Sequence, residues 1–307
     1  MPAEPWAVYA KELFPVGFGY PLWKPEPAST DGREIFIGDV GWLKEGEFRA
    51  LFNSIRDADH PVNQDLDVPR DFQVFYPPNL SIGKADRITQ QMVFSQSIRA
   101  SEVRADIVSD AASGVVPAWQ FHTGSDAGAL VVLSSPGVAE DIQSRRHIVN
   151  YMVDNLDSWL ESANTSHLDL HTENIIFVCG TLETTQWAMA AFQDDSYCNT
   201  DGYVFGQLDP FGSLELSIQI SNQVLPANHC RTVPHRLPDP GHDTPAAVSP
   251  GPDQCLFVHN YKGKRRLRKE PGQAPPGLYH LSFDSEARVC AYAYDPVNHL
   301  LDYILQV

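Results

Sequence analysis

The residues with the clearest chemistry are two histidines and an aspartate that alternate in the run His167-Leu168-Asp169-Leu170-His171. On a β-strand, side chains two residues apart lie about 7 Å apart on one face, so the three polar groups would point the same way. Two imidazoles and a carboxylate are ligands for zinc or iron. The alternation also fits a solvated strand face with both leucines turned inward, and we favour that interpretation. The run is a weak metal-site candidate, and we expect no cofactor.

A second group is a strip of six basic residues within eight positions. Such a strip can bind an anion, a phosphoinositide or a nucleic acid, or act as a nuclear import signal. Alternatively, it neutralises acidic groups of the same chain or forms a solvated hairpin tip. The chain has 39 acidic and 22 basic residues, and its net charge of −17 argues against nucleic acid as a partner. The anion-binding candidates are Lys262, Lys264, Arg265, Arg266, Arg268 and Lys269.

Aromatic side chains are frequent in residues 1–43, together with glycine and proline. Aromatic faces stack on sugars and cations, so this region is a candidate for a small-molecule or glycan site. The alternative, which we favour, is that the aromatic residues anchor an extended arm to the core. The ligand-binding candidates are Tyr20, Trp23, Asp39, Trp42 and Trp187.

Familiar catalytic and cofactor motifs do not occur in the sequence. We find no G-x-S-x-G, no H-E-x-x-H and no G-x-x-x-x-G-K-[ST]. Gly17-Phe18-Gly19 lacks the third glycine of a dinucleotide-binding loop and follows no predicted strand. We therefore name no catalytic residues and favour a binding protein over an enzyme.

The elements that must position these residues include two predicted helices. The longer helix, over about residues 136–163, would begin with Ser135 as N-cap and Pro136 at the first helical position. The shorter helix covers about residues 46–56. It is predicted from apolar residues at helical spacing, namely Phe48, Leu51, Phe52 and Ile55.

Most of the remaining pattern predicts strands. The clearest is residues 214–220, where apolar residues alternate with polar ones. We therefore predict an α+β fold, mainly antiparallel β-sheet with one long and one short helix. We interpret residues 1–307 as a single domain, with residues 1–43 as the arm and residues 225–254 as a Pro-rich loop. Further strands are predicted at residues 34–37, 103–107, 128–133, 175–179, 255–258, 279–283 and 289–293.

The composition fits a soluble intracellular protein. Apolar residues make up 43% of the chain, enough for a substantial core. The N-terminus lacks the basic and apolar regions of a signal peptide, and no apolar stretch is long enough for a transmembrane segment. The five cysteines are scattered and odd in number, which favours reduced thiols. We expect the protein to be cytoplasmic, with the nucleus as the alternative.

Sequence blocks spread over nearly the whole chain carry a family resemblance. They include Gly19-Tyr20-Pro21-Leu22-Trp23-x-Pro25-x-Pro27, Ile37-Gly38-Asp39-Val40-Gly41, Gly46-x-Phe48-x-x-Leu51-Phe52-Asn53, Gly128-Ala129-Leu130-Val131-Val132-Leu133 and Lys264-Arg265-Arg266. With these blocks the chain resembles a large family of uncharacterised proteins from basidiomycete fungi. It departs from the family pattern at Ser134-Ser135, where the family has proline, and at Glu183-Thr184-Thr185, where the family has a lysine. The resemblance implies a whole-chain intracellular domain of fungal origin and supplies no activity.

Three hypotheses of function follow. The first, which we favour because catalytic motifs are missing, is a non-enzymatic intracellular binding or sensing domain for a protein or small ligand. The second is a membrane-active, pore-forming-like protein, in which alternating strands such as residues 90–108 and 213–222 rearrange in lipid. The third is a metal-dependent enzyme of unrecognised type that uses His167, Asp169 and His171.

Overall fold

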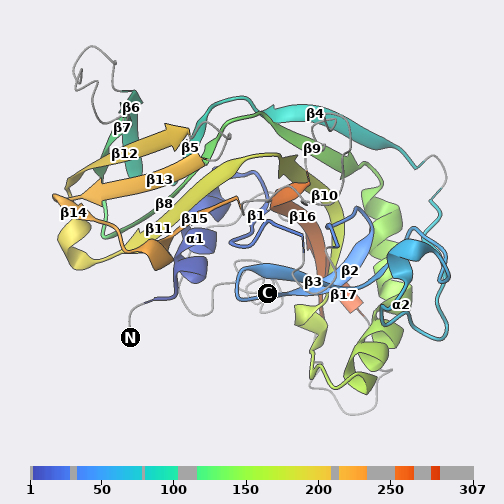
Figure 1. The fold of residues 1–307 in the computed structure, drawn as a ribbon. Helices are drawn as coiled ribbons and strands as arrows, with labels where there is room; N and C mark the ends of the chain where they lie inside the picture. Colours follow the sequence, from blue (N-terminus) through green and yellow to red (C-terminus); the bar gives the residue numbers. More distant parts are fainter. Residues whose placement is uncertain are drawn as a thin grey trace, which may run out of the picture.

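The computed structural model describes residues 3–27, 33–77, 80–102, 116–208, 214–233, 253–265 and 278–283. Over these ranges the chain forms three antiparallel sheets and two α-helices, which confirms the predicted α+β class with β-structure in excess (Figure 1). Sheet A contains β1 (Tyr20–Pro21), β2 (Asp39–Lys44), β3 (Glu47–Asn53), β4 (Ile82–Ile88), β9 (Gly137–Ile142), β10 (Ile176–Thr184), β16 (Gln254–Arg265) and β17 (Leu278–Phe283). Sheet B contains β5 (Met92–Phe94), β8 (Ala127–Leu133), β11 (Trp187–Gln193) and β15 (Cys230–Thr232). Sheet C contains β6 (Ile98–Glu102), β7 (Val116–Thr123), β12 (Asp201–Leu208), β13 (Leu214–Ile220) and β14 (Gln223–Val224).

The helices are few and mostly short. The α-helices are α1 (Pro5–Leu13) and α2 (Arg145–Thr165). Short 3-10 helices lie at Phe14–Val16, Pro61–Asn63, Thr172–Asn174, Asp195–Tyr197 and Ala227–His229. None of the helices in the described part of the chain is long and apolar enough to cross a membrane.

Sheet B is covered on both faces. In β8, Ala129, Val131 and Leu133 pack in a cluster with α1 and sheet A, whereas Leu130 and Val132 pack in a cluster with sheet C. Successive side chains of a strand point to opposite faces, so a strand buried on both sides needs an unbroken apolar run. This requirement explains why the run GALVVL contains no polar residue.

The central strand of sheet A is β10. One edge of β10 pairs with β16, and the other edge is shared by β2 near its start and β9 near its end. The strand β4 pairs only with β9 among the described residues and lies at the outer edge of the sheet (Figure 1). Strands from both ends of the sequence thus meet in one sheet, while the assignment of all residues to a single domain stays a prediction.

The long helix is confirmed, but its predicted first turns are wrong. Residues 137–142 form β9, which pairs with β4 on one side and β10 on the other. Pro136 lacks an N–H and directly precedes this paired strand instead of opening a helix. The helix α2 begins at Arg145 and covers sheet A with a buried stripe of Ile148, Met152, Leu156, Trp159 and Ala163.

The short helix predicted over residues 46–56 is wrong, because this segment forms β3 in a hairpin with β2. Glu45 and Gly46 have φ of 52° and 73°, the two positive values of a type I′ hairpin turn. A bulge opposite Val40 and Gly41 then inserts one extra residue into β3. Side chains on either side of the bulge enter different core clusters, so the strand imitates helical spacing.

The N-terminal region also differs from the extended arm that we expected. Pro5 opens α1, where the missing N–H is tolerated, and the helix ends before Pro15. The segment does lie on the core, since Tyr9 and Leu13 are fully buried. The strand predicted at residues 34–37 is wrong, because that segment is irregular and the strand begins at Asp39.

The remaining strand predictions divide into confirmed and untested ones. Strands at residues 128–133, 175–179, 214–220, 255–258 and 279–283 are confirmed. The predictions at residues 103–107 and 289–293 fall outside the described residues. Within the Pro-rich segment 225–254, β15 pairs with β11, and residues 234–252 are outside the described ranges.

Candidate functional site

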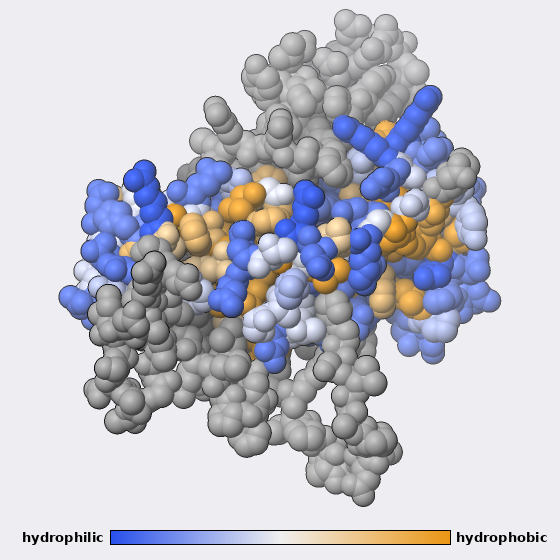
Figure 2. Space-filling model, turned by 90° about the horizontal axis from the view of Figure 1, so that it is seen from above, coloured by the Kyte–Doolittle hydropathy of each residue, from blue (hydrophilic) through white to orange (hydrophobic). Residues whose placement is uncertain are grey.

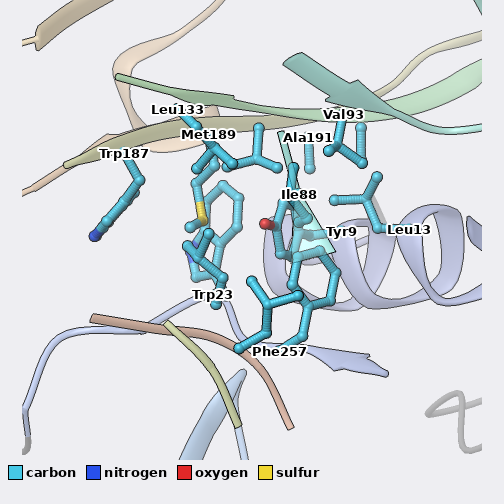
Figure 3. Close-up of a cluster of buried hydrophobic side chains, with 14 of the residues drawn as sticks. Tyr9, Leu13, Trp23, Ile88, Val93, Leu133, Trp187, Met189, Ala191 and Phe257 are labelled. Atoms are coloured by element: carbon cyan, nitrogen blue, oxygen red, sulfur yellow. The ribbon is translucent and has the colours of Figure 1, made fainter. Parts of the chain in front are cut away.

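Two of the aromatic candidates, Trp23 and Trp187, lie in a packed apolar cluster between sheets A and B (Figure 3). The ring of Trp23 meets that of Tyr9 nearly edge-on, with 5.2 Å between centroids. Trp187 is fully buried, and its indole N–H donates to Gln254 Oε1 at 3.3 Å. Figure 3 shows Trp23, Tyr9 and Met189 pointing toward one another. Both indoles therefore contribute to core packing.

Asp39 is a fully buried carboxylate that is bound from within the chain. Arg33 donates to both of its oxygens, from Nη1 at 2.8 Å and from Nη2 at 2.6 Å. The backbone N–H of Phe36 and Nδ2 of Asn53 donate to the same carboxylate, each at 2.8 Å. Burial raises the pKa of Asp39, while Arg33, Phe36 and Asn53 act in the opposite direction. These bonds hold the segment before β2 against the end of β3.

The other two aromatic candidates are also packed against neighbours. Tyr20 is buried on β1, opposite Val258 of β16. Trp42 on β2 is half-buried and packs against the cluster that α2 covers. The four aromatic candidates thus divide among three core clusters, with Trp23 and Trp187 in the same one, and they do not surround one cavity. Ligand binding by any of them stays a prediction.

The run from His167 to His171 does not form a strand, so the predicted shared face is wrong. After α2 ends at Thr165, His167 and Asp169 adopt left-handed backbone conformations, with φ of 61° and 49°. The side chain of Asn164 fixes the turn by two hydrogen bonds with the backbone of Leu170, at 2.8 and 3.1 Å. Among the residues that the structure describes, no group of three or more His, Cys, Asp or Glu side chains is placed to hold a metal ion.

The basic strip begins within β16. Lys262 lies opposite Ile176 of β10 and is only 6% exposed, so it belongs to the interior of sheet A. Lys264 and Arg265 follow at the end of the strand, where β16 pairs with β17. The candidates Arg266, Arg268 and Lys269 lie outside the described residues, and an anion site there stays a prediction.

Glu183 carries a carboxyl group that titrates near neutral pH. Burial raises its pKa to about 7, and the charges of Glu140 and Glu34 act in the same direction. A hydrogen bond from Thr181 and the charge of Lys84 oppose this rise. Such a carboxyl can give or take a proton at neutral pH, but catalysis would also need a positioned reacting group. Cys255 lies opposite on β16, but burial raises the pKa of its thiol well above the ordinary value, so it is not an activated nucleophile. We therefore consider the raised pKa of Glu183 for its effect on stability.

A histidine–aspartate pair spans three strands of sheet A. His259 of β16 and Asp141 of β9 both lie opposite Gly180 of β10, whose missing side chain lets them meet. The distance from His259 Nδ1 to Asp141 Oδ1 is 2.6 Å, and Nε2 lies 3.0 Å from the carbonyl oxygen of Phe18. Both ring nitrogens of His259 thus have partners within the fold. We infer that the pair holds the N-terminal segment on sheet A.

An open groove lies between the chain that leaves β3 and the chain that enters β4. Its volume is about 640 Å³, which is in the range of small-molecule sites. Figure 2 shows hydrophobic surface on the side of the molecule that β4 and β9 cover, between hydrophilic side chains. The groove is lined by Ile55, Arg56, Phe75, Tyr76, Pro77, Leu80 and Ile82.

Buried amides fix the wall that carries Ile55 and Arg56. The backbone N–H of Asn53 donates to Asn63 Oδ1 at 2.6 Å, and Asn63 Nδ2 donates to the carbonyls of Asn53 at 3.0 Å and Asp57 at 2.9 Å. The N–H of Ile55 donates to Asn53 Oδ1 at 3.1 Å. This network closes the loop after β3, so the backbone of this wall is held in place before any ligand binds.

The second wall is held by β3 and by the cluster under α2. The N–H of Phe75 donates to the carbonyl of Ser54 at 2.7 Å. The Phe75 ring lies 5.0 Å from that of Tyr151 on α2 and 5.6 Å from that of Phe177 on β10. Neighbouring side chains of extended chain point in opposite directions, so Tyr76 faces solvent with 86% of its surface exposed.

The groove combines apolar surface with a single charge. Seven large hydrophobic side chains are exposed in the described residues, and three of them line the groove: Tyr76, Leu80 at 38% and Ile82 at 46%. The only charged residue in the lining is Arg56, whose guanidinium forms no hydrogen bond or ion pair with the other described residues. A concave site lined mainly by apolar side chains with one charged group is typical of small-molecule sites. A ligand with an apolar body and one anionic group would satisfy it.

No motif in the sequence marks the groove. Residues 57–72 are rich in turn-forming residues, and nothing in their order brings residues 55–56 next to residues 75–82. The contact depends on the hydrogen bond from Phe75 to Ser54 and on the loop that Asn63 closes, and neither has a periodic signature. The one local feature of the sequence that points to the groove is a set of apolar residues at positions 75–82 without helical or strand periodicity.

No protein-family model matches the chain, and a search of curated proteins finds no significant match. The resemblance to a basidiomycete family therefore stays a prediction from the sequence blocks.

Proposed function

We propose that this protein is a non-enzymatic binding domain and that the groove between Ile55 and Ile82 is its ligand site. The observation that supports this proposal is the open apolar lining, in which Arg56 is the one charged side chain among the described residues. The ligand class that fits is a molecule with an apolar body and one anionic group. The intracellular setting expected from the sequence remains part of the proposal.

The energetics favour such a ligand. Fully burying an exposed Leu or Ile side chain gains about 1.5–3 kcal/mol. Leu80 and Ile82 are already more than half buried, so each offers a ligand less than this range, and the entropy of association must be subtracted. A guanidinium can donate two parallel hydrogen bonds to a carboxylate, sulfonate or phosphate, which fixes the orientation of the ligand. The apolar lining would supply most of the affinity, and Arg56 would supply selectivity for anions.

The test uses 8-anilinonaphthalene-1-sulfonate, a fluorescent apolar dye with one sulfonate, and the uncharged dye N-phenyl-1-naphthylamine. We expect saturable binding of one sulfonate dye per chain. Arg56→Gln should weaken the sulfonate dye about fivefold and leave the uncharged dye unchanged, because only the charge contact is lost. Tyr76→Ala should weaken both dyes.

The controls lie on sheet C, at the other end of the molecule (Figure 1). Arg99 and Tyr203 are exposed there, on β6 and β12. Arg99→Gln and Tyr203→Ala should bind both dyes like the wild type. Equal dye affinities in the Arg56 and Arg99 variants, together with unchanged binding by the Tyr76 variant, would remove the groove as the site.

The two alternative functions have their own tests. Leakage from anionic liposomes at about pH 5 and about pH 7.5 would support the membrane-active hypothesis. Stoichiometric metal in the purified protein, lost in a His171→Ala variant, would support the metal-dependent enzyme. The second alternative is weakened because His167 and Asp169 do not share a strand face with His171.

A further inference from the structure

The strand β4 has a free backbone edge that begins in the groove. It pairs with β9 on one side, and on the other side no strand pairs with it within the described ranges. Ile82 is the first residue of β4 and also lines the groove. The apolar cavity and the free edge are therefore continuous.

The ladder between β4 and β9 determines which backbone groups face outward. The N–H of Gln143 donates to the carbonyl of Ser81 at 3.5 Å, so these two residues form a hydrogen-bonded pair. Bonded and non-bonded pairs alternate in an antiparallel ladder, so Gly83 also faces β9. Ile82 and Lys84 consequently direct their N–H and C=O groups away from the sheet. Two donors and two acceptors are available to an incoming strand.

Charges protect only the later part of this edge. Asp86 and Arg87 are exposed on β4, and charged side chains discourage the pairing of edge strands, whereas the charge of Lys84 is paired with Glu140 of β9. Residues 80–83 carry no charge, and Leu80 and Ile82 are exposed. The accessible part of the edge is therefore the part beside the groove.

Arg56 indicates what the incoming strand carries. It is the only charge among the described residues of the lining, and a guanidinium matches the two oxygens of one carboxylate. The chain as a whole has a net charge of −17, which disfavours a peptide with many acidic side chains. A single terminal carboxylate next to an apolar side chain complements both the charge and the lining.

We propose that the groove binds the C-terminal end of an extended peptide, which adds a strand to the outer edge of β4. Its main chain pairs with Ile82 and Lys84, its apolar last side chain enters the groove, and its carboxylate binds Arg56. Main-chain hydrogen bonds supply affinity and the pocket supplies specificity in this mode of recognition. This inference rests on the proposed function of the groove and specifies the partner.

The test uses a random heptapeptide library displayed with free C-termini, followed by a synthetic copy of the strongest binder. We expect selected peptides to end in an apolar residue. Amidation of the C-terminus should weaken binding about tenfold, and Arg56→Gln should weaken the free acid about tenfold without changing the amide. The bound peptide should slow amide hydrogen exchange at Ile82 and Lys84 at least about tenfold and leave Gly83 nearly unchanged.

A variant of the edge itself supplies a second measurement. Lys84→Pro removes an outward N–H, a substitution that an edge strand tolerates, and should weaken peptide binding more than about tenfold. Lys84→Ala is the matched control. Both variants lose the ion pair with Glu140 at 2.7 Å, but only the proline loses the donor. The alanine variant should bind within about twofold of the wild type.

The outcomes separate the two proposals. If the sulfonate dye binds in the groove but the library yields no binder, strand addition is wrong and the groove is a small-ligand site. The same conclusion follows if a peptide binds without slowing exchange at Ile82 and Lys84, or binds the proline and alanine variants equally. If neither dye nor peptide binds, the proposed function of the groove itself fails.

Discussion

Aromatic side chains differ in exposure between the cluster around Trp187 and the groove beside Tyr76. Trp187 is fully buried between sheets, and its N–H is bonded to Gln254. Tyr76 comes directly after a buried residue, Phe75, yet 86% of its surface is exposed. Composition cannot separate these cases, because both rings belong to apolar neighbourhoods. The difference is whether a second layer of the fold covers the ring.

The covered and uncovered rings contribute to different processes. Burial of a ring on folding stabilises the folded state, whereas an exposed ring can still gain free energy when a ligand covers it. Sheet B lies between sheet C and the cluster with α1 and sheet A, so its aromatic residues stabilise the fold. The groove lies where no further described element covers the chain. If this contrast is correct, substitutions in the two regions should have different effects.

The largest expected effect is at Trp187. Trp187→Ala should lower the free energy of unfolding by about 3–5 kcal/mol, because it leaves a cavity and removes the donor to Gln254. Urea unfolding followed by circular dichroism measures this change. Tyr203→Ala, at an aromatic residue of sheet C that is 36% exposed and contacts Phe205, should cost clearly less, about 1 kcal/mol. A loss below about 1 kcal/mol at Trp187 would contradict tight packing of the cluster.

A second pair of substitutions tests how firmly the N-terminal segment packs. Gly46 has φ of 73°, and an added Cβ would lie 2.5 Å from the Cβ of Trp23. Gly17 has φ of 90°, and an added Cβ would have no atom within 4 Å. Gly17→Ala should lower the free energy of unfolding by about 1 kcal/mol through backbone strain alone. Gly46→Ala should cost about 1–3 kcal/mol more through overlap, and equal losses would mean that Trp23 moves away freely.

These residues also show which features the sequence could predict. The strand β8 could be predicted from its sequence, because a strand buried on both faces must be apolar throughout. The hairpin of β2 and β3 was misread, because the bulge shifts side chains between faces and produces a helix-like spacing. The strand β8 was therefore predictable because one rule decided it, whereas the prediction for β3 failed because a bulge in its pairing with the neighbouring strand changed the register.

The groove could not be predicted for a related reason. One wall is held by the amide of Asn63, which bonds backbone groups of Asn53 and Asp57, and the bond from Phe75 to Ser54 joins the second wall to it. Each is a contact between irregular segments, and no periodicity precedes it. Ligand candidates chosen by aromatic content selected the core instead, because large aromatic residues are most often used for burial.

Glu183 lies between the two extremes, as a half-buried polar group. Burial raises its pKa from 4.5 to about 7, so between these pH values the folded protein binds more protons at this site than the unfolded chain. The contribution of Glu183 to stability is present at low pH and is lost as pH rises toward about 7. Glu183→Gln should therefore unfold like the wild type near pH 4.5 and be more stable by about 1–2 kcal/mol near pH 8, a value reduced for partial exposure.

Unfolding free energies measured from about pH 4.5 to about pH 8 test this expectation. Glu161→Gln, at an exposed position on α2, is the control and should keep the pH slope of the wild type. If Glu183→Gln also keeps the pH slope of the wild type, Glu183 is solvated in the folded protein and its pKa is not raised.

The smallest expected effect on stability is at Tyr76, and it separates the two regions most directly. Because the ring is exposed, Tyr76→Ala should leave the free energy of unfolding within about 0.5 kcal/mol of the wild type. The same variant should weaken dye binding, measured by fluorescence titration, since the apolar surface offered to the ligand is reduced. A loss of stability comparable to that of Trp187→Ala would show that Tyr76 is covered in solution. Unchanged stability with weakened binding would show that the burial energy of Tyr76 is used in binding and not in folding.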